Sequence, residues 1–160
     1  MLAEARNPLI VAGGGIHLSQ AHAELVHLQQ MASIPVATTS MGKGAVDERH
    51  PLSVGVIGYF MGTRSATKGL RRLVQDADVI LFAGDRTNQN GTDGWTLFPN
   101  TASYIHIDID GQEVGRNYEA LRLVGDAKLT LAALGDALSQ LDLKTRMQSR
   151  GGIEATIAEG

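Results

Sequence analysis

The chain has 160 residues, 43% of them hydrophobic and 19% charged, which is the composition of a soluble, folded domain. The net charge of −3 gives no basic field for nucleic acid, and a sequence without cysteine has no disulfides or thiolate metal sites. No apolar run approaches the ~18 residues of a membrane span, and the first residues do not follow the signal-peptide pattern. We therefore expect a cytoplasmic protein that binds neither nucleic acid nor membrane.

The first predicted strand is followed directly by glycines. Residues 9–12 are an apolar run typical of a buried strand, and residues 13–15 are glycines. Glycines let backbone N–H groups approach a ligand, but Leu18 stands where the dinucleotide fingerprint needs its third glycine. This stretch predicts either a ligand-binding turn or a tight turn without a ligand.

A helix and a second strand come next. Ser19 is a candidate N-cap for a helix whose inner face carries apolar residues at helical spacing, namely Ala21, Leu25, Leu28 and Ala32. Residues 34–38 predict a strand, and the polar loop 39–44 follows it. This loop does not match a phosphate-binding P-loop, because Gly44 follows the lysine where Ser or Thr is required.

The segment from residue 52 to residue 77 predicts a short strand and a helix. Residues 52–58 are mostly apolar, and Tyr59 and Phe60 follow them, where the two rings either cover a flat ligand or pack in the core. Residues 63–77 predict a helix, and its inward face consists of Ala66, Leu70, Leu73, Val74 and Ala77.

The apolar run 79–83 predicts a central strand that is buried on both faces. Gly84 allows a sharp turn, and a polar loop follows that begins with Asp85 and Arg86. Ligands of open parallel sheets lie just outside the carboxyl ends of the strands, and a guanidinium fork can grip two phosphate oxygens. The loop is therefore a candidate phosphate site, and the alternative is a solvated turn.

The last third of the chain predicts two more strands. Residues 103–110 end in acidic side chains, which either accept hydrogen bonds from ribose hydroxyls or form a turn or helix cap. Residues 121–124 predict a short strand, after which Asp126 caps a helix whose apolar face carries Leu131, Leu134, Leu138 and Leu141. Residues 142–160 show no strong pattern and are interpreted as a linker or frayed tail.

Apolar strands that alternate with helices predict a three-layer α/β/α Rossmann-like domain with a mostly parallel sheet of about five or six strands. The sequence contains neither a G-x-S-x-G elbow nor an H-E-x-x-H motif, and it has no cysteine nucleophile. Nothing in it places two carboxylates together for acid–base work. We therefore expect a ligand-binding or structural module without a catalytic constellation of its own.

Five sequence pieces, in this order, resemble the central domain of thiamine-diphosphate enzymes, and the acetolactate synthase large subunits in particular. The pieces are residues 8–15, 34–39, 76–86, 106–110 and 124–127. The resemblance runs from about Asn7 to Leu141. It implies that residues 1–141 are such a central domain and that residues 142–160 are a linker or tail.

The resemblance also implies a longer parent enzyme that acts on 2-keto acids. In that family, the domain before the central one supplies a glutamate that activates the thiamine ring, and the domain after it holds the diphosphate through Mg²⁺ with a G-D-G motif followed by asparagine. Neither is present here, since Gly84-Asp85 continues with Arg86 and Gly125-Asp126 continues with Ala127. The implied partners are the missing N- and C-terminal domains, within a homodimer or homotetramer.

Middle domains of this family differ in what they bind: FAD in acetolactate synthases, the ADP moiety of coenzyme A or of an activator in oxalyl-CoA decarboxylases, and nothing in others. The resemblance implies that the loops at 13–15 and 39–40 contact the ligand through their backbone and that Arg86 contacts phosphate. It also implies that residues 108–109 lie near the adenosine, residues 126–127 near the adenine and residues 58–60 along the flavin. The implied cofactor-binding residues are Gly13, Gly14, Gly15, Thr39, Ser40, Gly58, Tyr59, Gly84, Arg86, Asp108, Ile109, Asp126 and Ala127.

Two departures from the synthase pattern leave the cofactor open. Synthases carry a glycine-methionine-histidine-glycine run where residues 58–61 stand, and a second arginine where Asn90 stands. Three hypotheses follow: a domain that binds FAD, ADP or coenzyme A; a structural module with an empty crevice that serves subunit contacts; and a free-standing NAD-binding module. The incomplete glycine fingerprint argues against the third.

Overall fold

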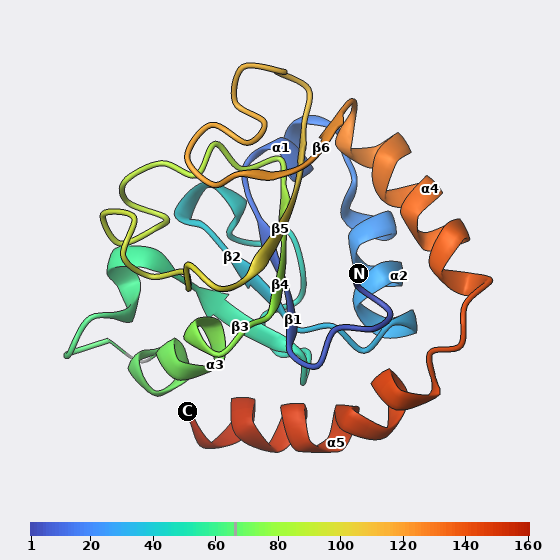
Figure 1. The fold of residues 1–160 in the computed structure, drawn as a ribbon. Coiled ribbons are helices and arrows are strands. Elements are labelled where there is room, and N and C mark those ends of the chain that lie inside the picture. The colour runs from blue at the N-terminus through green and yellow to red at the C-terminus, as the bar shows by residue number, and fades with distance from the viewer. Residues whose placement is uncertain (66) are drawn as a thin grey trace.

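Six parallel strands form the sheet around which the chain is built, in a computed structural model that describes residues 1–65 and 67–160 (Figure 1). Their order across the sheet is β3-β2-β1-β4-β5-β6. The strands are β1 (Pro8–Ala12), β2 (Val36–Thr38), β3 (Ser53–Val56), β4 (Val79–Ala83), β5 (Ser103–Asp108) and β6 (Ala120–Val124). Every pairing is parallel, as predicted.

The two strands at the centre of the sheet are the two most apolar runs of the sequence. Every residue of β1 and of β4 is buried, because helices or loops cover both faces of these strands. They pair in register from Pro8 beside Val79 to Ala12 beside Ala83, so both leave the sheet at the same level. The strand order reverses between them, and this switch point is where open α/β sheets hold ligands.

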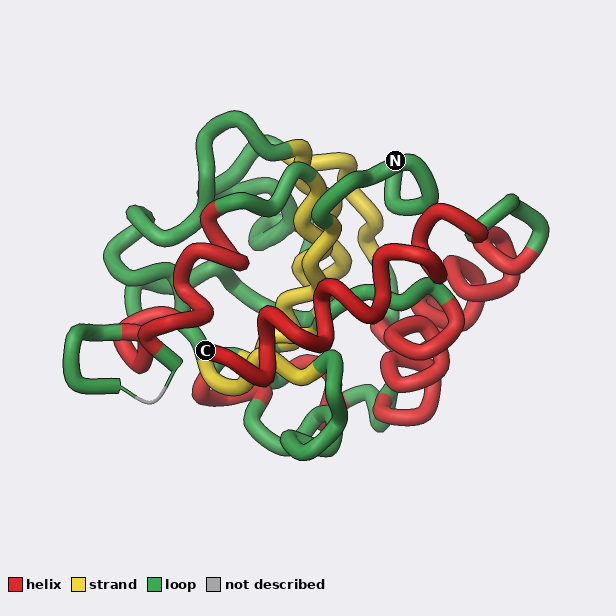
Figure 2. Tube along the Cα trace, turned by 90° about the horizontal axis from the view of Figure 1, so that it is seen from below, coloured by secondary structure: helices red, strands yellow, loops and turns green. Residues whose placement is uncertain are grey.

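Helices and short helical turns cover the two faces of the sheet (Figures 1 and 2). One face packs against α2 (His22–Met31) and α4 (Ala127–Ser139), with α1 (Gly15–Leu18) above them. The other face packs against α3 (Arg71–Gln75), the 3-10 turns η2 (Gly58–Met61) and η3 (Lys68–Leu70), and the segment around Phe98. A further turn, η1 (Ser40–Gly42), follows β2. The predicted three-layer fold is confirmed.

Two local predictions were wrong for the same physical reason, because hydroxyl side chains bond to nearby backbone instead of supporting a helix. The helix expected over residues 63–77 is reduced to η3 and α3, since Ser65 and Thr67 both donate to the carbonyl of Phe60. Ala66, which was assigned to that helix, lies outside the described residues. Ser19 does not cap α2; its hydroxyl donates to the carbonyl of Gly15 at 2.8 Å.

The segment predicted to be a frayed tail forms a helix, α5 (Lys144–Glu159), which runs beneath the amino ends of the strands (Figures 1 and 2). Its anchor is Arg146, which is 1% exposed. One guanidinium nitrogen donates to the carbonyls of Ala5 and Arg6 at 3.2 and 2.9 Å, and the other donates to that of Ser33 at 3.0 Å. The role of this segment as a linker between domains stays a prediction.

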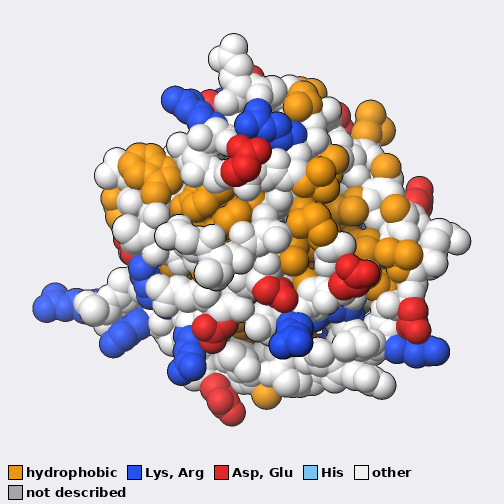
Figure 3. All heavy atoms as spheres, in the orientation of Figure 1, with side chains coloured by type: hydrophobic (Ala, Val, Ile, Leu, Met, Phe, Trp, Pro, Cys, Tyr) orange, Lys and Arg blue, Asp and Glu red, His pale blue; other side chains and the backbone are white. Residues whose placement is uncertain are grey.

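An apolar surface lies at one edge of the molecule, over β6 and α4 (Figure 3). Strand β6 is the last in the sheet order, so one of its edges has no strand partner among the described residues. Leu121 on β6 and Leu129 on α4 are each more than half exposed, and we call these two side chains the β6–α4 face. In the part of the chain that the structure describes, no helix is both long and apolar enough to cross a membrane.

Candidate functional site

A cavity of about 530 Å³ opens at the carboxyl ends of the strands, above the switch point between β1 and β4. The loops that follow β1, β2, β4, β5 and β6 line it. It brings together most of the predicted cofactor contacts, namely Gly14, Gly15, Thr39, Gly84, Arg86, Asp108, Ile109, Asp126 and Ala127. Residues that are far apart in the sequence meet here because parallel strands all end at the same edge.

Four of the predicted contacts lie outside the cavity lining: Gly13, Ser40, Gly58 and Tyr59. Gly58 and Tyr59 belong to η2, where the N–H of Tyr59 donates to the carbonyl of Asn90 at 3.0 Å. The Tyr59 ring is half exposed, near Gly94 of the loop that follows β4. It therefore sits beside that loop and not in the cavity.

The glycines after β1 serve the contact between two loops. The N–H of Gly15 donates to the carbonyl of Gly84 at 2.9 Å, and the N–H of Gly13 donates to that of Ala83 at 3.0 Å. A Cβ atom on Gly13 would lie 2.3 Å from the Gly84 oxygen, and one on Gly15 would lie 2.6 Å from the Gly84 Cα. The tight-turn interpretation accounts for Gly13 and Gly15, since their N–H groups are already bonded within the protein.

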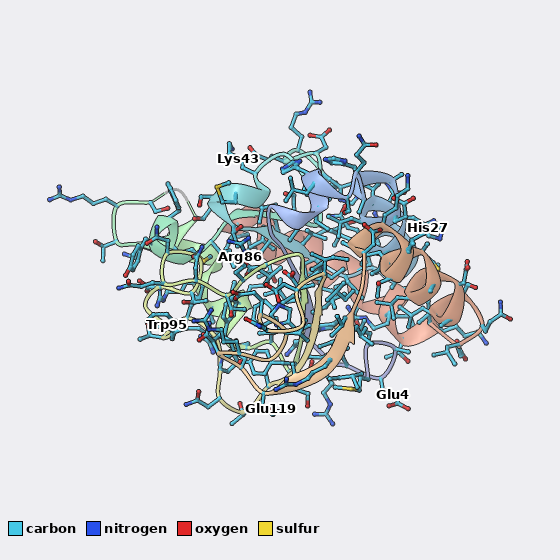
Figure 4. The ribbon with its side chains drawn as sticks, turned by 90° about the horizontal axis from the view of Figure 1, so that it is seen from above. Glu4, His27, Lys43, Arg86, Trp95 and Glu119 are labelled. Carbon is cyan, nitrogen blue, oxygen red and sulfur yellow. The ribbon has the colours of Figure 1, made fainter. Side chains whose placement is uncertain are left out.

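Arg86 is the cationic side chain of the β4 loop, and it lies near the middle of the face that carries the strand ends (Figure 4). Its side chain is exposed, and it forms no ion pair with any residue that the structure describes. Lys43, on the β2 loop, is instead paired with Glu48. Arg86 is therefore available to an anionic ligand at the cavity mouth.

Asp126 and Asp108, the two acidic residues predicted to contact the cofactor, each form a hydrogen bond within the protein. Asp126 is the N-cap of α4, as predicted, and its carboxylate accepts from the N–H of Leu129 at 3.1 Å. Asp108 accepts from the N–H of Asp110 at 3.0 Å and shapes the turn after β5. In each case the bond uses one carboxylate oxygen, and within the described residues the other oxygen has no hydrogen bond.

Asp85 is a cavity residue that sequence reasoning treated as part of a turn. It is 5% exposed, and its Oδ2 atom has no hydrogen-bond partner among the described residues. Burial raises the pKa of Asp85 to about 7; a hydrogen bond from the backbone of Thr87 opposes this rise, and the negative charge of Asp108 adds to it. The sequence feature that could have identified Asp85 as a cavity residue is its position, one residue after a glycine at the end of a strand that is buried on both faces.

Two histidines support the loops of the site. His106 donates from Nε2 to the carbonyl of Asp85 at 2.8 Å, while its Nδ1 accepts from the N–H of Gly115 at 3.1 Å. Burial lowers the pKa of His106, and the two bonds define a neutral ring that carries its proton on Nε2. His17, which sequence reasoning missed, lines the cavity, and its two ring nitrogens bond to His22 and to the carbonyl of Lys43.

The side chains that line the cavity determine which chemistry it could support. Among the described residues, no group of three or more His, Cys, Asp or Glu side chains lies close enough to hold a metal ion. The cavity offers an exposed guanidinium, two carboxylates on its far loops and a buried acid between its central loops. These groups suit a ligand that carries both phosphate and hydroxyl groups.

Comparison with known proteins gives one consistent result. The sequence model of the family described as "Thiamine pyrophosphate enzyme, central domain" matches residues 1–134. The chain is 40% identical over 143 residues to a probable acetolactate synthase large subunit of Methanococcus aeolicus, covering 89% of this chain and 22% of that protein.

Two further relatives have related names. A probable acetolactate synthase large subunit of Methanocaldococcus jannaschii is 40% identical over 147 residues, which is 91% of this chain and 24% of the relative. An acetolactate synthase of Arthrospira platensis is 38% identical over 141 residues, which is 88% of this chain and 24% of the relative. The chain thus spans less than a quarter of the length of these relatives.

Proposed function

The chain belongs to the thiamine pyrophosphate enzyme central-domain family, and from this we propose that it is the middle domain of an acetolactate-synthase-like enzyme and binds an adenine nucleotide such as FAD. The observation that supports nucleotide binding is the cavity at the switch point, with the guanidinium of Arg86 at its mouth, which has no ion-pair partner among the described residues. A cavity of about 530 Å³ falls within the range of roughly 300–1,000 Å³ that is usual for ligand pockets.

The residues present fit the adenosine and pyrophosphate half of such a cofactor. Arg86 would bind the pyrophosphate, because a guanidinium offers paired donors to phosphate oxygens. Asp108 would accept from ribose hydroxyls through the oxygen that its turn leaves free. The flavin ring of FAD would extend out of the cavity toward Tyr59, which lies outside the lining.

The reaction itself belongs to the parts of the enzyme that flank this domain. Thiamine diphosphate, held there with Mg²⁺, would supply the carbanion chemistry for a 2-keto acid. In this proposal the residues of the present chain hold a nucleotide and position the flanking domains. They make no contact with the reacting carbon atoms.

A structural role is the second candidate, and the β6–α4 face favours it. Exposed apolar side chains on one surface commonly mark a protein–protein contact. Such a face would pack against a flanking domain or against a second copy in a homodimer or homotetramer. Sedimentation of the chain and of Leu129→Lys tests self-association: a dimer that this substitution dissociates supports it, and a monomer at high concentration rejects it.

Calorimetric titration of the purified chain with FAD, ADP, coenzyme A and NAD tests nucleotide binding. Saturable binding of FAD supports a synthase-type middle domain. Preference for ADP or coenzyme A keeps nucleotide binding but moves the parent enzyme toward the oxalyl-CoA decarboxylase branch. No binding of any of the four at millimolar concentration contradicts the proposal and leaves the structural role.

A further inference from the structure

Asp85 lies between the two central loops of the cavity. Gly84, with φ of +59°, turns the chain so that Asp85 lies against the loop after β1. A Cβ atom on Gly13 would be 2.7 Å from the Asp85 Cβ, so Asp85 packs directly against Gly13. Asp85 is one of the residues that line the cavity, and its Oδ2 atom, which is almost fully buried, has no hydrogen-bond partner among the described residues.

No cation balances the Asp85 carboxyl within the described part of the chain, where it takes part in no ion pair. Its titratable neighbours are Asp108 on β5 and Tyr118 on the β5–β6 connection. From β5, His106 is neutral and bonds to the backbone oxygen of Asp85, not to its carboxyl group. From the other elements around the cavity, the ionisable residues are Arg86, His17 and Asp126.

An anionic ligand makes a negative charge at Asp85 still less favourable. Phosphate groups would enter a cavity whose walls already include the carboxylates of Asp108 and Asp126. A carboxylate at Asp85 would repel them, whereas a carboxylic acid can donate a hydrogen bond to a phosphate oxygen. Burial, which raises the pKa of Asp85 to about 7, places the two forms close in free energy near neutral pH.

We propose that Asp85 meets the nucleotide as a neutral carboxylic acid and donates its proton to a phosphate oxygen, so that the cavity binds its ligand together with one proton from solvent. This inference rests on the proposed nucleotide-binding function. No covalent bond changes: the proton stays on Asp85 and is shared with the ligand while the nucleotide is bound. Binding is therefore strongest at acidic pH and weakens as the pH rises above about 7.

Calorimetric titration with FAD in two buffers of different ionisation enthalpy counts the protons taken up. FAD is the suitable probe because its pyrophosphate is a diester with no ionisation near neutral pH. At pH 8 we expect about one proton per FAD, and about none at pH 6. The dissociation constant should rise about tenfold per pH unit above pH 7.

Asp85→Asn separates this role from mere packing. The amide has the same shape and carries a permanent donor, so we expect FAD binding without proton uptake and with an affinity independent of pH. Asp110→Asn, an exposed acid outside the cavity lining, should keep the proton uptake. FAD binding by the unsubstituted chain without proton uptake overturns the inference and leaves the proposed function intact. Failure of all four nucleotides to bind overturns the proposed function.

Discussion

Gly15 donates its backbone N–H to the carbonyl of Gly84 across 2.9 Å, and this bond joins the loops that leave the two central strands. The two backbones lie so close that a Cβ atom on Gly15 would be 2.6 Å from the Gly84 Cα. The floor of the cavity is therefore set by backbone packing between β1 and β4. The side chains that line the cavity come from the five loops around this contact.

The loop contact predicts a difference between two neighbouring glycines. Gly15→Ala should lower the free energy of unfolding by about 1–3 kcal/mol, because backbone must move to make room. Gly14→Ala, whose Cβ would meet the Met41 side chain at 3.2 Å, should cost less than about 1 kcal/mol. Urea unfolding of both variants tests this, and equal costs would mean that the loops are not packed as described.

Asp85 should make the protein less stable as the pH rises. Its pKa is raised from 3.8 to about 7 in the folded chain, so between these values the folded state holds a proton that the unfolded state has lost. Stability therefore falls between about pH 4 and pH 7, by at most about 4 kcal/mol from this group.

Asp85→Asn removes this slope. Urea unfolding at pH 5 and at pH 8 should show that the unsubstituted chain loses about 2–3 kcal/mol more than the variant between the two values. All other titrating groups are common to both proteins and cancel in this difference. An equal loss in the two proteins would show that Asp85 is ionised in the folded chain at neutral pH.

Arg146 should be the anchor of α5. Arg146→Ala leaves the carbonyls of Ala5, Arg6 and Ser33 without their donor, and we expect a loss of about 2–5 kcal/mol in the free energy of unfolding. Arg150→Ala, which breaks a partly exposed pair with Glu154 on the same helix, should cost less than about 1 kcal/mol. Similar small losses from both would indicate that α5 does not dock under the sheet.

Gly151 tests whether residues 144–159 are helical in solution. It lies inside α5, is exposed, and has nothing near its Cβ position. Gly151→Ala should therefore stabilise the chain by about 0.5–1 kcal/mol. Gly44→Ala, at φ of +85° in equally open space, should destabilise it. Thermal unfolding measures whether each variant is more or less stable than the unsubstituted chain, and a destabilised Gly151→Ala would contradict the helix.

The sequence predicted best where one local rule decides the structure. Apolar runs defined β1 and β4, and Asp126 was predicted as the cap that α4 uses. Strand ends that share one edge were enough to place Arg86 and Asp108 in one cavity.

Features that depend on distant contacts could not be predicted. The polar sequence of α5 has no helical pattern of apolar residues, and its docking depends on carbonyls at positions 5, 6 and 33. The burial of Asp85 depends on how closely the loop of Gly13 approaches. The loop after β4 is held in left-handed conformations at Thr87, Asp93 and Trp95, where the indole N–H donates to the carbonyl of Thr87 at 3.1 Å.

Substitution of Arg86 tests the central claim, that this cavity binds an adenine nucleotide through the guanidinium at its mouth. The measurement is the dissociation constant of FAD, or of ADP if ADP is preferred, for the unsubstituted chain, for Arg86→Gln and for Arg64→Gln. Arg64 is an exposed arginine outside the cavity lining and serves as the matched control.

Loss of a charge-assisted bond predicts that Arg86→Gln weakens binding by about 1.5–3 kcal/mol, roughly 10- to 150-fold, while Arg64→Gln leaves it unchanged. An Arg86→Gln variant that binds the nucleotide as tightly as the unsubstituted chain would contradict the account.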